Sequence, residues 1–211
     1  MATVQSLITS ARYDLRDYGK GLVFDNAELL DYLNRMVGVM DSTLASIESD
    51  LVEAESSGEI TFSEDATTAD ISDLNSGLWD SIRSVWISTD QKTQVSVNEM
   101  RWKRIYDLTD GEPQYWALSG TDLLFEKTAD DDYDLIIYYN KKTGELTLTD
   151  SMPYNSIFNE LFREMLVLHA KAKKENKMLN TDQYYYTVFK NRAMEENIRR
   201  DYIKKTYSKD F

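Results

Sequence analysis

Apolar residues recur at helical spacing at both ends of the chain and alternate with polar residues between them. The spacing predicts one helix over residues 4–18 and a second over 26–55. Asp25, followed three residues later by Glu28, has the pattern of a capping box at the start of the second helix. The apolar positions of that helix form a heptad-like stripe of Leu33, Val37, Met40, Leu44, Ile47 and Leu51.

A stripe of this length needs a facing helix along its whole extent. Packing within the chain, against the first helix and the C-terminal helices, is the favoured explanation. The second explanation adds contacts with neighbouring copies of the chain, which would make the stripe a seam of both the bundle and an oligomer.

The middle of the chain changes to alternating and turn-rich sequence, which is typical of strands. Residues 133–140 (YDLIIYYN) form the clearest strand, with Tyr133, Leu135, Ile137 and Tyr139 on one face. Residues 98–108 predict a short helix with Asn98 as its N-cap. Further strands are expected at residues 59–63, 81–89, 93–97, 115–118 and 122–127, and the last two are joined by a tight hairpin at 119–121.

Helical spacing returns at Pro153, which suits the first position of a helix over residues 153–175. A last helix begins at Thr181 or Asp182. The predicted fold class is therefore α+β: mainly an α-helical bundle with a small inserted antiparallel β domain and a long C-terminal helix and tail. We expect N-terminal helices in 1–58, the β domain in 59–149, and C-terminal helices with a docking tail in 150–211.

Composition excludes several kinds of site. The 211 residues include no Cys and one His, His169, so thiolate metal sites, disulfides and multi-His metal centres are ruled out. No phosphate-binding glycine motif is present, and we expect no metal and no cofactor. No apolar run reaches the length of a membrane span, and the N-terminus lacks the pattern of a signal peptide. We therefore expect a soluble protein that is made in the cytoplasm and has no membrane partner.

Charge is distributed unevenly along the chain. The net charge of −13 divides into −17 for residues 1–150 and +4 for residues 151–211. An acidic body argues against general binding to nucleic acid, because phosphate recognition needs a basic surface. The basic end carries aromatic and aliphatic residues among its cations: Arg199, Arg200, Tyr202, Ile203, Lys204, Lys205, Tyr207, Lys209 and Phe211. This segment is either a solvated tail or a docking tail that orders on an acidic, grooved partner.

Three further patterns raise the question of chemistry. The run Asp130-Asp131-Asp132-Tyr133-Asp134 offers carboxylates for Ca²⁺ but lacks the glycine turn of a calcium loop, which favours a solvated hairpin tip. Among 37 acidic residues a catalytic pair for a cell-wall hydrolase is conceivable, yet no spacing singles one out. Four Trp and fourteen Tyr raise the alternative of a sugar-binding module, although core and interface roles are favoured.

The order of the motifs resembles the head-to-tail connector (adaptor) proteins of tailed bacteriophages. The resemblance rests on RYDLRDYG, on FDNAELLDYLNRMV, on GEPQYWALSGTDLLFEK followed by YDLIIYYNKK, and on LTLTDSMPYNSIFNELF. It spans roughly residues 5–175, and it lies in the order and spacing of the motifs, since none of them carries invariant chemistry.

The resemblance implies a structural protein of the virion without enzymatic activity. Such proteins form a dodecameric ring below the portal protein, join it to tail or nozzle proteins, and line the channel for DNA, which passes without specific binding. Carried onto this chain, the C-terminal segment becomes the candidate for docking on the portal. The acidic stretches at 64–80 and 130–134 become loops that face the channel or the next tail protein. A few such adaptors are assigned a muramidase activity, but no residue here supports it.

Overall fold

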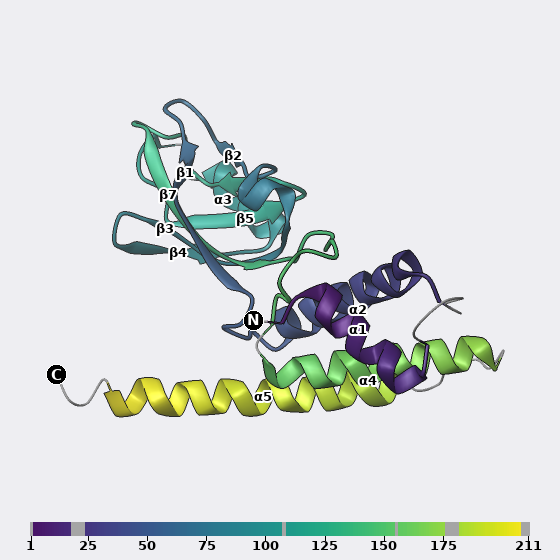
Figure 1. Cartoon of the computed structure of the whole chain (residues 1–211). Coiled ribbons are helices and arrows are strands. Elements are labelled where there is room, and N and C mark those ends of the chain that lie inside the picture. The colour runs from purple at the N-terminus through teal and green to yellow at the C-terminus, as the bar shows by residue number, and fades with distance from the viewer. Residues whose placement is uncertain (1, 18–23, 107–108, 155, 176–181, 208–211) are drawn as a thin grey trace. The chain divides into compact units, whose positions relative to one another are not determined.

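The computed structural model describes residues 2–17, 24–106, 109–154, 156–175 and 182–207, with backbone alone at 57–59, 156–157, 182–185 and 200–207. The chain divides into two compact units. The helical unit consists of Met1–Val52 and Thr143–Phe211, and the β unit consists of Glu53–Lys142 (Figure 1). Each unit has its own apolar core.

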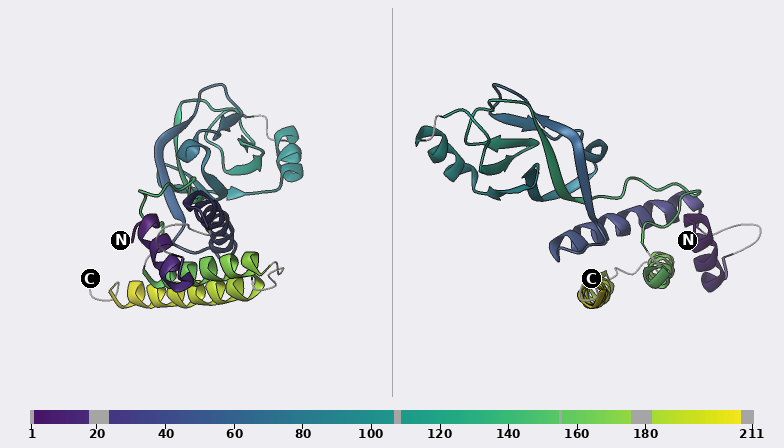
Figure 2. Two further views of the ribbon diagram at one scale, coloured as in Figure 1. Left: turned by 45° about the vertical axis from the view of Figure 1, so that its right-hand side comes forward. Right: turned by 90° about the vertical axis from the view of Figure 1, so that its left-hand side faces the viewer.

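The helical unit contains helices from both ends of the chain. They are α1 (Val4–Leu15), α2 (Asn26–Ser46), α4 (Ser156–Lys174) and α5 (Asp182–Tyr207). α4 and α5 lie side by side, and α1 and α2 pack against α4 (Figures 1 and 2). The helix predicted from Pro153 begins three residues later, at Ser156, so the prediction of Pro153 at its first position is wrong.

Helix α2 begins as predicted and ends earlier. The Asp25 carboxylate accepts a hydrogen bond from the Glu28 backbone N–H at 2.6 Å, which confirms Asp25 as the cap. The Glu28 carboxylate pairs with Lys173 of α4. The prediction that this helix continues to residue 55 is wrong, because a Schellman turn follows Ser46. In that turn Glu48 takes a φ of 52°, and the Ser49 N–H bonds to the Leu44 carbonyl at 3.0 Å.

Helix α1 ends in the same kind of turn, with Arg16 at a φ of 55°. The turn directs Asp17 back to Arg12, and the two side chains form a buried ion pair at 2.8 Å. Arg12 also donates to the Asn26 side-chain carbonyl at 2.8 Å, at the start of α2. Since a buried ion pair needs such further hydrogen bonds to offset desolvation, this network ties the end of α1 to the start of α2.

Aromatic residues fill the centre of the helical unit. Tyr154, Phe158, Phe162 and Phe189 are buried, with ring centroids 4.9–6.3 Å apart in the contacting pairs. Phe189 comes from α5, so this cluster binds α5 to the rest of the unit. Val188, also of α5, is half-buried against the same core.

The segment that leads from the β unit to α4 is held along α2. The Asn34 side chain accepts from the Leu146 N–H at 3.0 Å and donates to the Leu146 carbonyl at 3.2 Å. About two turns further along α2, the buried Asp41 carboxylate accepts from the Thr143 N–H at 2.6 Å and from the Tyr154 hydroxyl. An extended segment thus receives the backbone partners that a helix or sheet would otherwise supply.

The β unit is one curled sheet of seven strands in the order β1-β7-β3-β4-β5-β6-β2. The pairs are antiparallel except β4 and β5, which are parallel. The curl brings the edge strands β1 and β2 near one another (Figure 2). The strands are β1 (Glu53–Phe62), β2 (Thr68–Asp70), β3 (Trp79–Ile87), β4 (Asp90–Gln94), β5 (Tyr115–Ser119), β6 (Asp122–Phe125) and β7 (Tyr133–Lys141).

The predicted fold class therefore needs correction. A mainly helical bundle with a small inserted antiparallel β domain is wrong, because the β unit is a seven-stranded mixed sheet with its own core. The error arises at β1, which begins at Glu53 in a stretch that was predicted as helix. The parallel pairing of β4 with β5 also escaped prediction, because it depends on the crossover through α3 (Val97–Tyr106).

Several local predictions within the β unit are confirmed. Leu135, Ile137 and Tyr139 of β7 face the core, with Tyr133 half-buried at its end. The hairpin between β5 and β6 turns at Gly120, whose φ is 65°. For α3 the existence of the helix is confirmed, but its cap is different. The Ser96 hydroxyl, not Asn98, accepts from the Glu99 N–H at 3.1 Å.

Candidate functional site

The predicted seam of α2 lies mostly inside the helical unit. Leu33, Val37, Met40 and Leu44 are at most 2 % exposed and belong to its core. Ile47 and Leu51 are half-buried and pack against that core beyond the end of the helix. The first four residues are thus buried by packing within one copy. The exposed Val39 lies on another side of α2.

The predicted docking tail is a continuation of a helix. α5 extends to Tyr207, so the segment from Arg199 to Tyr207 has a helical backbone, while Lys209 and Phe211 lie outside the described residues. Arg199 is exposed and pairs with Glu196 at 3.0 Å. For Arg200, Tyr202, Ile203, Lys204, Lys205 and Tyr207 the structure describes the backbone only.

The fixed part of α5 ends just before this segment. Phe189 and Ala193 are fully buried, Glu196 is 8 % exposed, and Asn197 accepts from the Ser49 hydroxyl at 2.8 Å. Ile198 is then 70 % exposed. In Figure 1 the C-terminal part of α5 runs on past the N-terminal end of α4. The helix therefore has an anchored part up to Asn197 and a protruding part after it.

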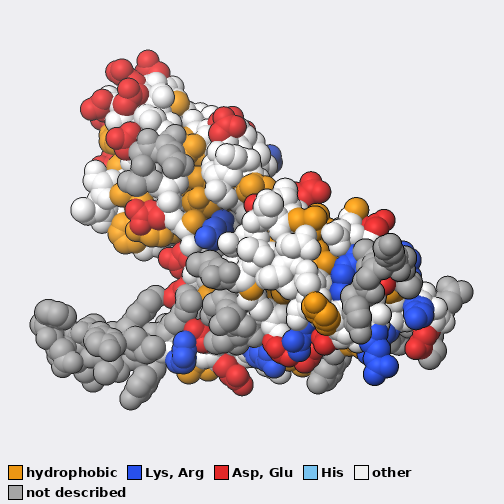
Figure 3. All heavy atoms as spheres, viewed as in Figure 1, with side chains coloured by type: hydrophobic (Ala, Val, Ile, Leu, Met, Phe, Trp, Pro, Cys, Tyr) orange, Lys and Arg blue, Asp and Glu red, His pale blue; other side chains and the backbone are white. Residues whose placement is uncertain are grey.

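Only part of the acidic stretch 64–80 is the loop that was predicted, because β2, a 3-10 helix at Leu74–Gly77 and the start of β3 occupy much of it. Its first two residues gather with the second stretch at one tip of the β unit. Glu64 and Asp65 follow β1, and the Asp130–Asp132 run precedes β7. The Asp132 carboxylate accepts from the Glu64 N–H at 2.8 Å, and the Asp65 N–H donates to the Ala129 carbonyl at 2.9 Å. These bonds hold exposed carboxylates from two loops together, and Figure 3 shows the resulting acidic cluster in red.

This tip has the character of a solvated hairpin end. Asp134, at the start of β7, is exposed and accepts from the Thr61 hydroxyl at 3.4 Å. The Tyr133 hydroxyl donates to Asp130, and this bond, with a smaller effect of burial, raises the pKa of Tyr133 to about 12. Within the described ranges, no group of three or more His, Asp or Glu residues has the arrangement of a metal site.

Asp150 and His169, two titratable residues of the helical unit, are held by structural contacts. Hydrogen bonds from the Thr147 N–H and hydroxyl lower the pKa of Asp150, the opposite of what a general acid requires. The His169 ring stacks on Tyr32, with 3.4 Å between the ring centroids. His169 therefore packs between α4 and α2.

The four Trp residues have different surroundings. Trp116 is buried and donates to the Lys92 carbonyl at 3.2 Å, while Trp79 and Trp86 are half-buried on β3. Trp102 of α3 is 61 % exposed, beside Ile105 at 61 % and Tyr106 at 80 %. This exposed apolar group on α3 was missed by the sequence reasoning. Its signal is a short helix with apolar residues at i, i+3 and i+4, while Met100 alone turns to the core.

Helix α3 holds these residues firmly, because polar bonds fix it to the sheet. The Arg104 guanidinium donates to the carbonyls of Phe125 and Thr67 at 2.7 and 2.6 Å. The Lys103 ammonium lies 3.5 Å above the Tyr115 ring, a cation–π contact. An exposed face on a well-anchored helix is a rigid surface for contacts.

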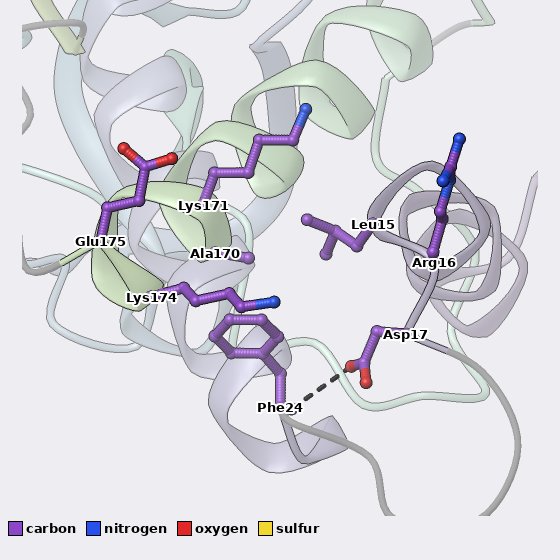
Figure 4. Close-up of a pocket in the computed structure, with 8 residues that line it drawn as sticks. All are labelled: Leu15, Arg16, Asp17, Phe24, Ala170, Lys171, Lys174 and Glu175. Atoms are coloured by element: carbon purple, nitrogen blue, oxygen red, sulfur yellow. Dashed lines mark hydrogen bonds between the residues drawn. The ribbon is translucent and has the colours of Figure 1, made fainter.

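The helical unit has a pocket of about 440 Å³ beside the end of α1 (Figure 4). Lys171 and Lys174 reach out from α4 on one side, and Arg16 lies on the other. Leu15, Phe24 and Ala170 supply the apolar part of its lining. Among the residues described there, the Asp17 carboxylate accepts from the Phe24 N–H at 3.3 Å, which closes the network that begins at Arg12.

No helix in the described part of the chain is long and apolar enough to cross a membrane. What the two units do offer is a protruding helix end, an acidic tip and an exposed aromatic face on rigid elements. All three are surfaces of a kind that suits contacts with other macromolecules.

Comparison with known families agrees with this interpretation. The model of the SU10 adaptor protein family matches residues 2–207, and the chain belongs to that family. It is therefore an adaptor, a structural protein of a bacteriophage, and its family implies a place in the virion and contacts with portal and tail proteins. A search among curated proteins finds no match.

Proposed function

We propose that copies of this chain assemble into a ring that joins the portal protein to the tail and surrounds the path of the DNA. The family supports the adaptor role. The observation that carries the finer proposal is the division of α5 into an anchored part up to Asn197 and a protruding part from Ile198.

The protruding part of α5 is the proposed portal-docking element. It carries the cations of the basic C-terminal segment, and its helical backbone continues to Tyr207. A helix that leaves its own bundle with exposed apolar and basic residues can lie in a groove of an acidic partner. Among the side chains that the structure describes, the anchoring contacts of α5 end before Arg199, so we expect docking to be separate from folding of the helical unit.

The acidic tip has a second proposed role, toward DNA. Carboxylates of Glu64, Asp65 and the Asp130–Asp132 run project from one end of the β unit. If these tips line the channel, the negative charge repels DNA phosphates, so that the genome slides without specific binding.

Removal of residues 199–211 tests the docking role. We expect the shortened chain to fold, with unchanged far-ultraviolet circular dichroism per residue, and to lose binding to the portal protein of the same virion. A matched variant, Val39→Ala on the exposed side of α2, should bind the portal as the full chain does. Unchanged portal binding by the shortened chain would refute the role of α5.

A further inference from the structure

Two surfaces of the β unit carry exposed or half-buried apolar side chains that its core does not use. The first, here called the α3 face, consists of Arg101, Trp102, Ile105 and Tyr106. The Trp102 and Tyr106 rings are nearly parallel, with 6.3 Å between centroids. Arg101 is exposed and makes no ion pair with the described residues. Trp, Tyr and Arg are the residues most enriched at the energetic centres of protein interfaces.

A cavity of about 460 Å³ lies beside the α3 face. Trp102, Tyr106 and Tyr115 supply its aromatic lining, and Glu99, Lys103 and Glu126 supply its polar lining. The Glu126 carboxylate is already satisfied, since it accepts from the N–H groups of Gln114 and Tyr115 at 2.6 and 3.0 Å. The cavity therefore has aromatic walls that can receive a large side chain of a partner. Its carboxylate Glu126 is not an unpaired charge that needs a cation.

The second surface, here called the β7 face, is the side of β1, β7 and β3 that points away from the core. Leu135 and Ile137 point inward, so by alternation Asp134, Ile136 and Tyr138 point outward. Trp86 of β3 pairs with Ile136, and Glu55 of β1 pairs with Tyr138.

The β7 face is apolar at its centre and has carboxylates at its rim, beside the ion pair of Arg83 with Glu53. Trp86, Ile136 and Tyr138 are half-buried, and the Trp86 and Tyr138 rings meet edge to face at 6.4 Å. Asp134 and Glu55 are exposed beside them. A hydrogen bond to Glu55 raises the pKa of Tyr138. In Figure 3 hydrophobic side chains and acidic ones lie next to each other on the unit that carries β3 and β7.

The two faces lie on opposite sides of the same unit. Both views of Figure 2 place α3 on one side of the sheet and β1 with β7 on the other. The α3 face carries the exposed cation Arg101, the β7 face carries the exposed carboxylates of Asp134 and Glu55, and both faces have an aromatic centre. Complementary surfaces on opposite sides of one body allow a head-to-tail contact, which generates a closed ring where the rotation between copies closes.

We propose that the α3 face of one copy binds the β7 face of the next copy and that this contact forms the ring. Arg101 of one copy then lies opposite the carboxylates at the rim of its neighbour, and the aromatic centres exclude water between them. The proposal rests on the proposed ring, and it adds the surface through which the copies meet.

Site-specific cross-linking tests this contact, because the chain has no cysteine of its own. Asn98→Cys places a thiol one turn before Arg101 on α3, and Thr61→Cys places one opposite Asp134 on β1. Neither change removes an aromatic residue of the two faces. A chain with both substitutions should give a ladder of covalent multimers with a bismaleimide. Each single variant should stay monomeric on denaturing gels, because a head-to-tail contact brings unlike positions together.

Charge reversal tests the same contact through its strength. We expect Arg101→Glu and Glu55→Arg each to weaken self-association about tenfold in analytical ultracentrifugation, since like charges then meet. The chain that carries both reversals should recover most of the loss. Asp73→Arg, at an exposed site of the same unit, is the control and should leave self-association unchanged.

The outcomes separate this proposal from the proposed ring. Cross-linked ladders and recovery by the double reversal support the contact. Rings seen by electron microscopy without cross-links, and unchanged by Arg101→Glu, would overturn the contact and leave the ring in place. If Arg101→Glu lost portal binding but kept its self-association, the α3 face would be assigned to the portal and the proposed contact would be overturned. A chain that stays monomeric, alone and with the portal, and forms no cross-links would overturn both.

Discussion

The Tyr154 hydroxyl donates a hydrogen bond to the carboxylate of Asp41, and both residues are buried in the helical unit. Burial, followed by the charge of Asp41 and this hydrogen bond, raises the pKa of Tyr154, so the phenol stays protonated. Thr143 also donates to Asp41, through its backbone N–H and its hydroxyl. This one carboxylate therefore holds together α2, the start of the segment that follows the β unit, and the aromatic core.

Tyr154→Phe should destabilise the protein by about 1.5–3 kcal/mol, because it removes a hydrogen bond to a buried charge. Urea unfolding followed by circular dichroism measures the change. Tyr13→Phe is the matched control, since Tyr13 is 64 % exposed, and it should cost less than about 0.5 kcal/mol. Equal effects of the two substitutions would contradict the assigned role of the Asp41 network.

In the β unit one buried charged residue is a cation, Lys92, and its partners are exposed to solvent. Its side chain is fully buried, and its ammonium pairs with Asp90 at 2.7 Å and Glu112 at 2.5 Å. Both carboxylates are partly exposed, so they remain solvated when the lysine is removed. We expect Lys92→Ala to cost about 2–4 kcal/mol through lost packing and pairing, and Lys92→Met, which keeps the apolar stem, to cost about half of that. If urea unfolding showed the same loss of stability for Lys92→Ala and Lys92→Met, the packing of the apolar stem would contribute nothing and the prediction would be wrong.

The Tyr133 phenol should ionise near pH 12, because its hydrogen bond to Asp130 favours the protonated form. A raised pKa in the folded state adds stability below the unfolded value of about 10, and this stability is lost as the pH rises toward 12. Relative to Tyr133→Phe, the natural chain should therefore lose stability between pH 10 and 12. Difference absorbance of the two chains at the phenolate band measures the titration, and a midpoint near 10 would contradict the bond.

Reversing charge at the acidic tip should create an affinity for DNA. Replacing Glu64, Asp65, Asp130 and Asp131 with Lys removes the repulsion, and we expect retention on a DNA column that falls steeply with salt. Asp132 stays unchanged because it accepts from the Glu64 N–H. The natural chain should pass the column without retention. Retention of the natural chain at physiological salt would refute the proposed role of the tip.

The sequence predicted the elements whose signals are local. The Asp25 cap, the inward face of β7 and the hairpin at Gly120 follow from short-range patterns, and all are confirmed. The end of α2 could not be predicted in this way. Glu48 takes the left-handed conformation where glycine is usual, so the apolar spacing up to Leu51 suggested a longer helix.

The wrong fold class and the missed α3 face have the same physical cause, since both depend on long-range pairing. The parallel contact of β4 with β5 requires α3 as a crossover, and only the finished sheet shows which side of α3 is left uncovered. The basic C-terminal segment was recognised from charge, whereas its helical backbone up to Tyr207 was not. A polar helix without an apolar stripe gives a weak periodic signal.

Electron microscopy of the chain bound to the portal protein of the same virion tests the central claim most directly. The proposed function predicts a closed ring of copies below the portal, with the α5 segment after Asn197 in contact with it. A portal that binds no ring, or a ring attached through a surface other than this end of α5, would contradict the proposal.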